Sequence, residues 1–393
     1  MLIALNQDNE HVHAAKIKIV KQLPKHDLYS CPGCKAPVFL KKGKIKQAHF
    51  SHYAQSNCQM FSEGETEEHV LGKQLLYNWF IQQGYPCQLE AYLPELKQRP
   101  DLLIWLNEKR AVAVEFQCSS LSHERMVERT EGYLKNNYEV YWVLGSQFKL
   151  TRSISAFQRM FMYKFKKSGY CLFFLDVYRE QLNICTDIQQ NQLGSAVAFK
   201  EILVKLASSN LTALTDIVTQ TTCQNRQFKK MKNKIIAKEL LASHHFLNRS
   251  RMYQETEMVL FQKYIYQRGH SLVSLPKEIY FLVENKLIIK TLPHFWKFIL
   301  LEWVTKKSLG TVITRLEITS QLKQMIKDKH LTFYSTPMIP LTEKRKAIDP
   351  FIHLLVQCNI LAEVLPNQWL ILSEPHFYLS EQEKLTDFSC FIK

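Results

Sequence analysis

The chain has 393 residues, of which 46% are hydrophobic, and contains only 11 glycines and 13 prolines, which excludes a fibrous or disordered protein and predicts two or three folded domains. The formal net charge of +15 indicates a polyanionic partner, with solubility alone as the alternative. The sequence shows neither a signal peptide nor an apolar run of about 18 residues, so we expect a cytoplasmic protein without a membrane span.

The charge is distributed unevenly along the chain. Residues 1–60 hold 9 basic and 3 acidic side chains, residues 61–150 hold 9 and 13, and residues 151–393 hold 33 and 20. An acidic centre between basic flanks is expected when basic neighbours bring a carboxylate site to nucleic acid. We predict three parts: a zinc-finger-like module over 1–61, an α/β domain over 62–195, and a mainly helical basic domain over 196–393. Helix and hairpin signals after residue 350 suit a winged-helix-like unit at its end.

Four residues of the first part have the spacing of zinc ligands. Cys31 and Cys34 in CPGC, with His49 and His52 in HFSH, form C-x2-C-x14-H-x2-H. A tetrahedral Zn²⁺ takes four nitrogen or sulfur ligands from two short turns, so the pattern predicts a closed, structural zinc site. Cys58 lies close enough to replace one histidine, and the alternative is that CPGC is only a turn. The run KKGKIK between the two pairs would form a basic hairpin suited to phosphate contacts.

The pattern of the second part predicts an α/β fold. Apolar residues at helical spacing predict a helix over 62–84 that starts with a Ser62–Glu65 capping box and ends at Gly84. Strands are expected over 87–93, 100–106, 111–117 and 139–145, with a helix over 121–137 before the last of them. A hairpin over 171–185 would extend the sheet. This order predicts a mixed sheet flanked by helices.

Two acids lie in strands that are otherwise apolar. A turn near residues 108 and 109 would place Asp101 opposite Glu115 or its neighbour, with Glu115 and Gln117 on one face. Buried carboxylates without a cation are costly, and carboxylate oxygens suit Mg²⁺ or Mn²⁺. Glu68, on the apolar face of the preceding helix, is the predicted third acid. We therefore expect a divalent metal at this position.

Several basic residues are candidates for contacts with DNA phosphates. His69 and Lys73 follow Glu68 on the first helix, where they would contact phosphate or orient a ligand, with a solvated polar face as the alternative for both. Arg125 and Arg129 lie four residues apart on the next helix, where they would clamp a phosphate or belong to a solvated charged face. The run RQFKKMKNKIIAK of the third part contributes Lys229, Lys230, Lys232 and Lys234.

These residues resemble the PD-(D/E)xK nuclease core, with P-D at 100–101 and E-x-Q at 115–117. The chain as a whole is similar to the competence protein CoiA family, through CPGC, HFSH, GETEEHVLGK, RPDLLI, VEFQCSSLS and YWVLG. The resemblance covers the first 150 residues best. It implies a protein that processes incoming DNA during transformation and recombination. It also implies that Asp101 and Glu115 bind the catalytic metal, and that Gln117 replaces the usual lysine and orients the attacking water or the phosphate.

The sequence favours a metal-dependent deoxyribonuclease of PD-(D/E)xK type that hydrolyses phosphodiester bonds. The amide of Gln117 can orient a group but adds no charge, so the metal would contribute more of the catalysis. The alternative is a DNA-binding accessory protein that recruits a recombinase or helicase and cuts nothing. A zinc-dependent transcription regulator would explain the finger and the terminal unit but not the acidic core.

Overall fold

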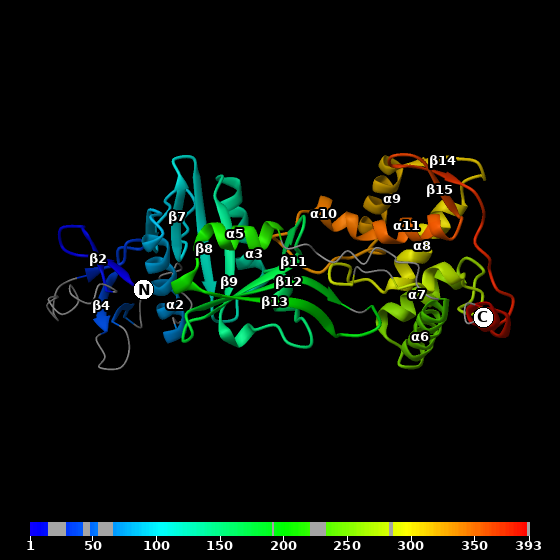
Figure 1. Ribbon diagram of the computed structural model, residues 1–393, viewed down its shortest axis with the longest axis horizontal. Coiled ribbons are helices and arrows are strands. Elements are labelled where there is room, and N and C mark those ends of the chain that lie inside the picture. The colour runs from blue at the N-terminus through cyan, green and yellow to red at the C-terminus, as the bar shows by residue number, and fades with distance from the viewer. Residues whose placement is uncertain are drawn as a thin grey trace. The chain divides into compact units, whose positions relative to one another are not determined.

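The computed structural model describes residues 1–14, 29–41, 48–53, 66–190, 192–220, 233–282 and 286–390. The chain divides into two compact units (Figure 1). The first comprises Met1–Thr151, Ser155–Ile188 and Phe199–Cys223, and the second comprises Arg152–Ile154, Gln189–Ala198 and Gln224–Lys393. Within the described ranges, no helix is both long and apolar enough to cross a membrane.

The first unit begins with a small antiparallel sheet of five short strands in the order β2-β1-β3-β4-β5. The strands are β1 (Ile3–Leu5), β2 (His11–His13), β3 (Tyr29–Ser30), β4 (Pro37–Lys41) and β5 (His49–His52). Tyr29, Val38 and Phe50 form part of a hydrophobic core of their own. Such a small core leaves room for a metal to contribute to stability.

An eight-stranded mixed sheet forms the centre of the first unit, in the order β13-β12-β11-β9-β8-β7-β6, with β10 paired to β11. Strands β8 and β9 are parallel, as are β9 and β11, whereas the β7–β8 and β11–β12 pairs are antiparallel. The bounds are β6 (Cys87–Leu89), β7 (Leu102–Asn107), β8 (Arg110–Gln117), β9 (Glu139–Leu144), β10 (Tyr163–Phe165), β11 (Gly169–Asp176), β12 (Gln181–Gln190) and β13 (Val197–Lys205). The predicted mixed sheet is confirmed.

Helices α2 (Glu67–Gln82) and α3 (His123–Lys135) cover opposite faces of this sheet. Gly72 of α2 lies against the ring of Phe116, whereas Tyr133 of α3 contacts the neighbouring Glu115, and adjacent strand residues point to opposite faces. Helix α2 begins later than predicted, because its N-cap is Thr66; the expected capping residues Ser62 and Glu65 lie outside the described residues. Two shorter helices are α4 (Ala156–Met160) and α5 (Leu211–Gln220).

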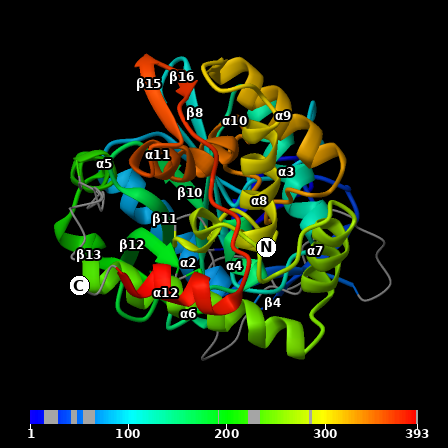
Figure 2. The same ribbon diagram turned by 90° about the vertical axis from the view of Figure 1, so that its right-hand side faces the viewer.

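The second unit is mainly helical, as predicted. Its helices are α6 (Asn233–Met252), α7 (Thr256–Tyr266), α8 (Pro293–Thr305), α9 (Arg315–Lys327), α10 (Leu341–Arg345), α11 (Asp349–Gln357) and α12 (Glu381–Cys390). A three-stranded sheet has the order β14-β16-β15, from β14 (Val312–Thr314), β15 (Leu361–Leu365) and β16 (Gln368–Ile371). Figure 2 shows β15 and β16 side by side next to α11.

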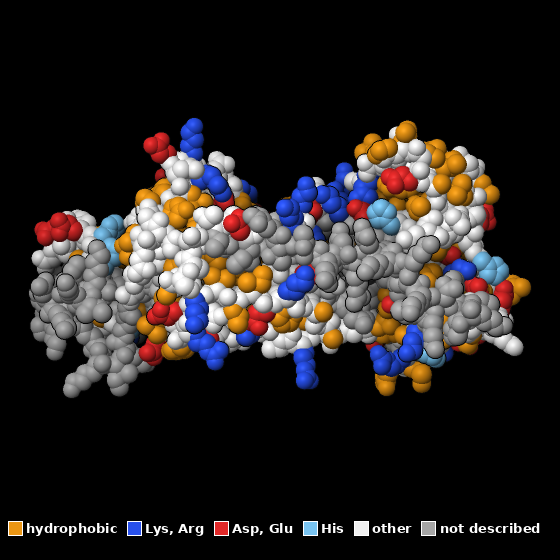
Figure 3. Space-filling model, in the orientation of Figure 1, with side chains coloured by type: hydrophobic (Ala, Val, Ile, Leu, Met, Phe, Trp, Pro, Cys, Tyr) orange, Lys and Arg blue, Asp and Glu red, His pale blue; other side chains and the backbone are white. Residues whose placement is uncertain are grey.

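Two features of this region refine the sequence prediction. The succession α8, β14, α9, α11 and the β15–β16 hairpin has the winged-helix order, which the sequence indicated only for its last part. Strand β13, by contrast, lies where the sequence predicted the start of the helical domain, and it extends the large sheet. Hydrophobic side chains gather on the surface of the winged-helix-like part (Figure 3), including the exposed Leu316 and Leu365.

Candidate functional site

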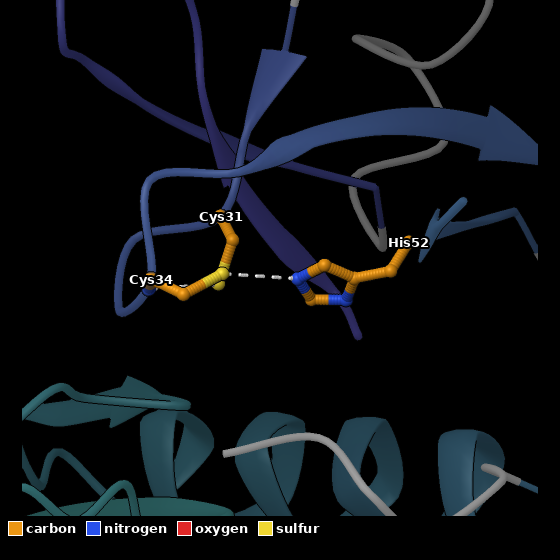
Figure 4. Close-up of side chains that lie close together, drawn as sticks. All are labelled: Cys31, Cys34 and His52. Atoms are coloured by element: carbon orange, nitrogen blue, oxygen red, sulfur yellow. Dashed lines mark hydrogen bonds between the residues drawn. The ribbon is translucent and has the colours of Figure 1, made fainter. Parts of the chain in front are cut away.

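Two cysteines and one histidine of the first unit converge on one point (Figure 4). Cys31 follows β3, Cys34 lies in the turn before β4, and His52 ends β5. Their candidate ligand atoms all lie within 4.8 Å of one another, and Cys34 Sγ is 3.4 Å from His52 Nε2. The Cys34 backbone N–H also points at Cys31 Sγ, at 3.5 Å. Burial raises the pKa of Cys31 to about 12, so a bound cation is needed to hold it as a thiolate at neutral pH.

The fourth predicted ligand, His49, is not part of this cluster. His49 and His52 lie three residues apart in β5, and side chains of a strand alternate between its faces, so the two imidazoles point to opposite sides. The structure therefore brings together three of the four predicted zinc ligands. The alternative ligand Cys58 lies outside the described residues, as does KKGKIK apart from Lys41.

The second candidate site lies at the start of β7 and the end of β8. Leu102 pairs with Val114, so Asp101, directly before β7, lies opposite Glu115. The backbone N–H of Phe116 donates a hydrogen bond to Asp101 Oδ2 at 2.9 Å. The register of the hairpin therefore places the two acids at facing backbone positions, at one end of the paired strands.

Asp101 contacts two basic side chains of α2. His69 Nε2 lies 3.1 Å from Asp101 Oδ2, and Lys73 Nζ lies 3.9 Å from Oδ1. Burial alone would raise the pKa of Asp101, but His69, Lys73 and Arg129 outweigh it and hold this pKa well below its usual range. Lys73 is 0% exposed, which rules out the solvated polar face that the sequence left open for it. His69 and Lys73 are one helical turn apart and reach the same carboxylate.

Glu115 is held by the other helix, α3. It is 1% exposed, and its Oε1 accepts hydrogen bonds from Arg129 Nη2 and from the Tyr133 hydroxyl, both at 2.5 Å. Burial raises the pKa of Glu115 to about 7, the Arg129 guanidinium opposes this rise, and the charge of Asp101 adds to it. Arg129, for which the sequence left open a phosphate clamp or a solvated charged face, thus binds Glu115.

The buried acids have cations of their own in the chain. Glu90 is also buried, and it binds both Lys73 and Arg99, at 2.5 Å and 3.1 Å. Three carboxylates are therefore balanced by three side-chain cations: Glu90, Asp101 and Glu115 by Lys73, Arg99 and Arg129. Charge compensation alone therefore does not require a metal, because basic residues distant in sequence already pair with these carboxylates.

The other predicted residues make different contacts or fall outside the described residues. Glu68 Oε1 accepts from the Ser146 backbone N–H at 2.8 Å, so the side chain is directed to the end of β9. Gln117 is buried, and its amide donates to the Ser119 carbonyl at 3.0 Å. Arg125 is half-buried on α3. Lys229, Lys230 and Lys232 lie outside the described residues, as does the side chain of Lys234, which falls in α6.

The donors around Asp101 suit a divalent cation chemically. Two carboxylates and a neighbouring imidazole are ligands that Mn²⁺ accepts, and the carboxylates also suit Mg²⁺. Both contacts to Glu115 fall on Oε1, so a metal would use Oε2. In the described part of the chain, only the Cys31 cluster gathers three such groups within 4.8 Å. His69, which the sequence offered as a phosphate contact or as part of a solvated polar face, contacts Asp101 from α2 together with Lys73.

The fold and the two sites define a nuclease-like α/β protein with an N-terminal Cys/His module. Family models of competence protein CoiA match three stretches: the N-terminal domain at 12–61, the nuclease-like domain at 65–219 and the C-terminal domain at 239–385. The chain therefore belongs to the competence protein CoiA family. It is 23% identical to Competence protein CoiA of Bacillus subtilis (strain 168) over 373 residues, which is 93% of this chain and 95% of that protein. No solved structure matches it.

Proposed function

We propose that the protein is a metal-dependent nuclease that hydrolyses DNA phosphodiester bonds during transformation and recombination. The observation that carries the proposal is the pair of carboxylates of a nuclease-like domain: Asp101, directly before β7, faces Glu115 of β8. The name of the B. subtilis relative, a competence protein, supports the link to transformation.

The residues around the pair have distinct tasks in this proposal. Asp101 and Glu115 would hold Mg²⁺ or Mn²⁺ with His69 beside them, and the bound metal would polarise the phosphate and lower the pKa of an attacking water. The Phe116 N–H and His69 fix Asp101, while Arg129 fixes Glu115. Fixed ligands need no reorganisation when the substrate arrives.

The substrate side of the site is supplied by neutral and basic groups. Gln117, two residues after Glu115 on the same face of β8, orients a water molecule or a phosphate oxygen through its amide. Arg125 and the basic run with Lys229, Lys230, Lys232 and Lys234 are proposed contacts to DNA phosphates. Zn²⁺ at Cys31, Cys34 and His52 would be structural, because the cluster is part of the small five-stranded sheet.

A specific observation favours the second candidate function, a DNA-binding accessory protein that recruits a recombinase or helicase. The carboxylates are already balanced by Lys73, Arg99 and Arg129, so the core folds without a metal charge. A scaffold of this kind would retain the nuclease-like fold and bind DNA without cutting it.

The deciding experiment is cleavage of labelled single-stranded, duplex and branched DNA with Mg²⁺ or Mn²⁺. We expect Asp101→Asn and Glu115→Gln to lower the rate by roughly 100-fold or more. Glu139→Gln is the matched control, because this exposed carboxylate of β9 pairs only with the exposed Arg110 among the ion pairs that the structure describes. A folded wild type that binds every substrate and cuts none would reject the nuclease in favour of the accessory protein.

A further inference from the structure

Glu90 connects the Cys/His module to the acid site. Its carboxylate accepts hydrogen bonds from the Leu2 backbone N–H at 3.0 Å, directly before β1, and from the Ile3 N–H at 3.3 Å, at the start of β1. From the other side, Lys73 Nζ lies 2.5 Å from Oε1 and Arg99 Nη1 lies 3.1 Å from Oε2. The side chain is fully buried and its backbone has φ +51°, a strained conformation for a glutamate.

Strand β1 touches both segments that carry the metal-ligand candidates. It pairs with Ser30 of β3, the residue immediately before Cys31. Near the start of β1, the Met1 carbonyl accepts a hydrogen bond at 2.8 Å from the N–H of Phe50, which lies two residues before His52. A change in the position of the Cys31 or His52 segment is therefore transmitted directly to the backbone that Glu90 holds.

On the far side of Glu90, the connection reaches Asp101 through a single side chain. Lys73 Nζ is 2.5 Å from Glu90 and 3.9 Å from Asp101 Oδ1, with no exposure to solvent. In such a buried position, the ammonium group must remain next to an anion. If Glu90 moves with β1, Lys73 therefore moves toward Asp101 and competes for the oxygen that a cation would use.

We propose that Glu90 is a positioning residue, through which the occupancy of the Cys31–Cys34–His52 cluster sets the distance between Lys73 and Asp101. The inference deepens the proposed function, and its part concerning a metal at Asp101 rests on that function. If the contact of Glu90 with β1 and Lys73 served stability alone, neither a buried carboxylate nor a buried lysine would be needed, since apolar residues of similar volume stabilise as well or better.

The Phe116 amide offers a readout that needs no catalytic metal. Its N–H donates to Asp101 Oδ2, so its hydrogen exchange reports displacement of that carboxylate. We expect zinc removal from the wild type by a chelator, or Cys34→Ser, to accelerate exchange at Phe116 by about tenfold. The Ile184 amide of β12, in the same sheet, should not change.

Double variants then test whether Glu90 carries the effect. When Cys34→Ser is added to Glu90→Gln, the rate of hydrogen exchange at the Phe116 amide should change by less than about twofold, because the effects of coupled residues are not additive. Should Glu90→Gln fail to fold, Lys73→Met interrupts the same path on its other side and should show the same loss. Glu139→Gln is the control in which the full Cys34→Ser effect persists.

Two outcomes would overturn the inference. The first is unchanged exchange at Phe116 on zinc removal, and the second is an equal Cys34→Ser effect with and without Glu90. Mn²⁺ titration separates this inference from the proposed function. A wild type that binds no Mn²⁺ refutes the metal at Asp101, while the Phe116 exchange data still decide whether Glu90 connects the two sites.

Discussion

Replacing Gly72 with alanine tests the packing that brings α2 to the acid site. A Cβ atom at this position would lie 2.0 Å from Cε1 and 2.5 Å from Cδ1 of Phe116. Phe116 is only 1% exposed, so its ring has no solvent-filled space into which to turn. The helix or the strand must therefore shift to accommodate a single methyl group.

Two opposing effects determine the sign of the result. Helix propensity alone favours alanine over glycine by about 1 kcal/mol. Inserting atoms into a well-packed core costs about 1–3 kcal/mol, and a contact of 2.0 Å lies at the severe end of this effect. We therefore expect Gly72→Ala to lower the free energy of unfolding by about 1–2 kcal/mol, and to move His69 and Lys73 away from Asp101.

Denaturant unfolding of the full chain measures this change, with Gly132→Ala in α3 as the matched control. A Cβ at Gly132 would meet the amide end of the Gln98 side chain, at 2.4 Å from Nε2, and this flexible end can move aside. Gly132→Ala should thus be neutral or stabilising. Phe116→Leu should recover part of the stability lost in Gly72→Ala. A Gly72→Ala protein as stable as the wild type would refute the close packing of α2 on β8.

The remaining predictions concern a buried lysine, a helix cap and metal binding. Burial lowers the pKa of Lys297 from 10.5 to about 7, so between pH 7 and 10.5 the unfolded chain binds one more proton than the folded chain. The free energy of unfolding should therefore rise with pH in this range, by up to about 1.4 kcal/mol per pH unit. Lys297→Met should lose this slope, and urea unfolding that gives equal slopes for the variant and the wild type would contradict the assignment. Thr66→Ala removes the acceptor for the His69 N–H and should cost about 1 kcal/mol, whereas Thr66→Ser should not. Mn²⁺ should bind more tightly when a DNA oligonucleotide is present, because the phosphate offsets the added charge; calorimetry that gives one affinity in both conditions would contradict this.

Local patterns were sufficient to predict the central hairpin. Alternation in β7 and β8 and the polar turn between them determine which residues face each other, so the pairing of Asp101 with Glu115 follows from short-range information. Strand β13 has no comparable signal, since it has charged residues at Lys200, Glu201 and Lys205 and only Val204 is buried. Its place in the sheet depends on pairing with β12, which the sequence pattern does not show.

Helical periodicity was less reliable for α2. The sequence placed Glu68 on the inward face and left a phosphate contact or a solvated polar face open for Lys73. Lys73 is fully buried, however, and Glu68 bonds to the backbone of Ser146. Periodicity assumes that one face of a helix is covered. Helix α2 instead has the sheet on one side and Glu90, which also binds β1, beside Lys73. Long-range contacts of this kind determine burial but leave no periodic signal.

Burial of acids is therefore weak evidence for a metal in this fold. Lys73, 28 residues before Asp101, offsets the cost of desolvating that acid, and Arg129, 14 residues after Glu115, does the same for Glu115. What still favours a metal is that both protein contacts to Glu115 fall on a single oxygen, and that Asp101 remains 13% exposed where a substrate could reach it. A cation there would add positive charge to a balanced cluster, and the phosphate of a bound DNA strand is the anion best placed to offset it. Metal binding and substrate binding are thus expected to be mutually dependent in this family member.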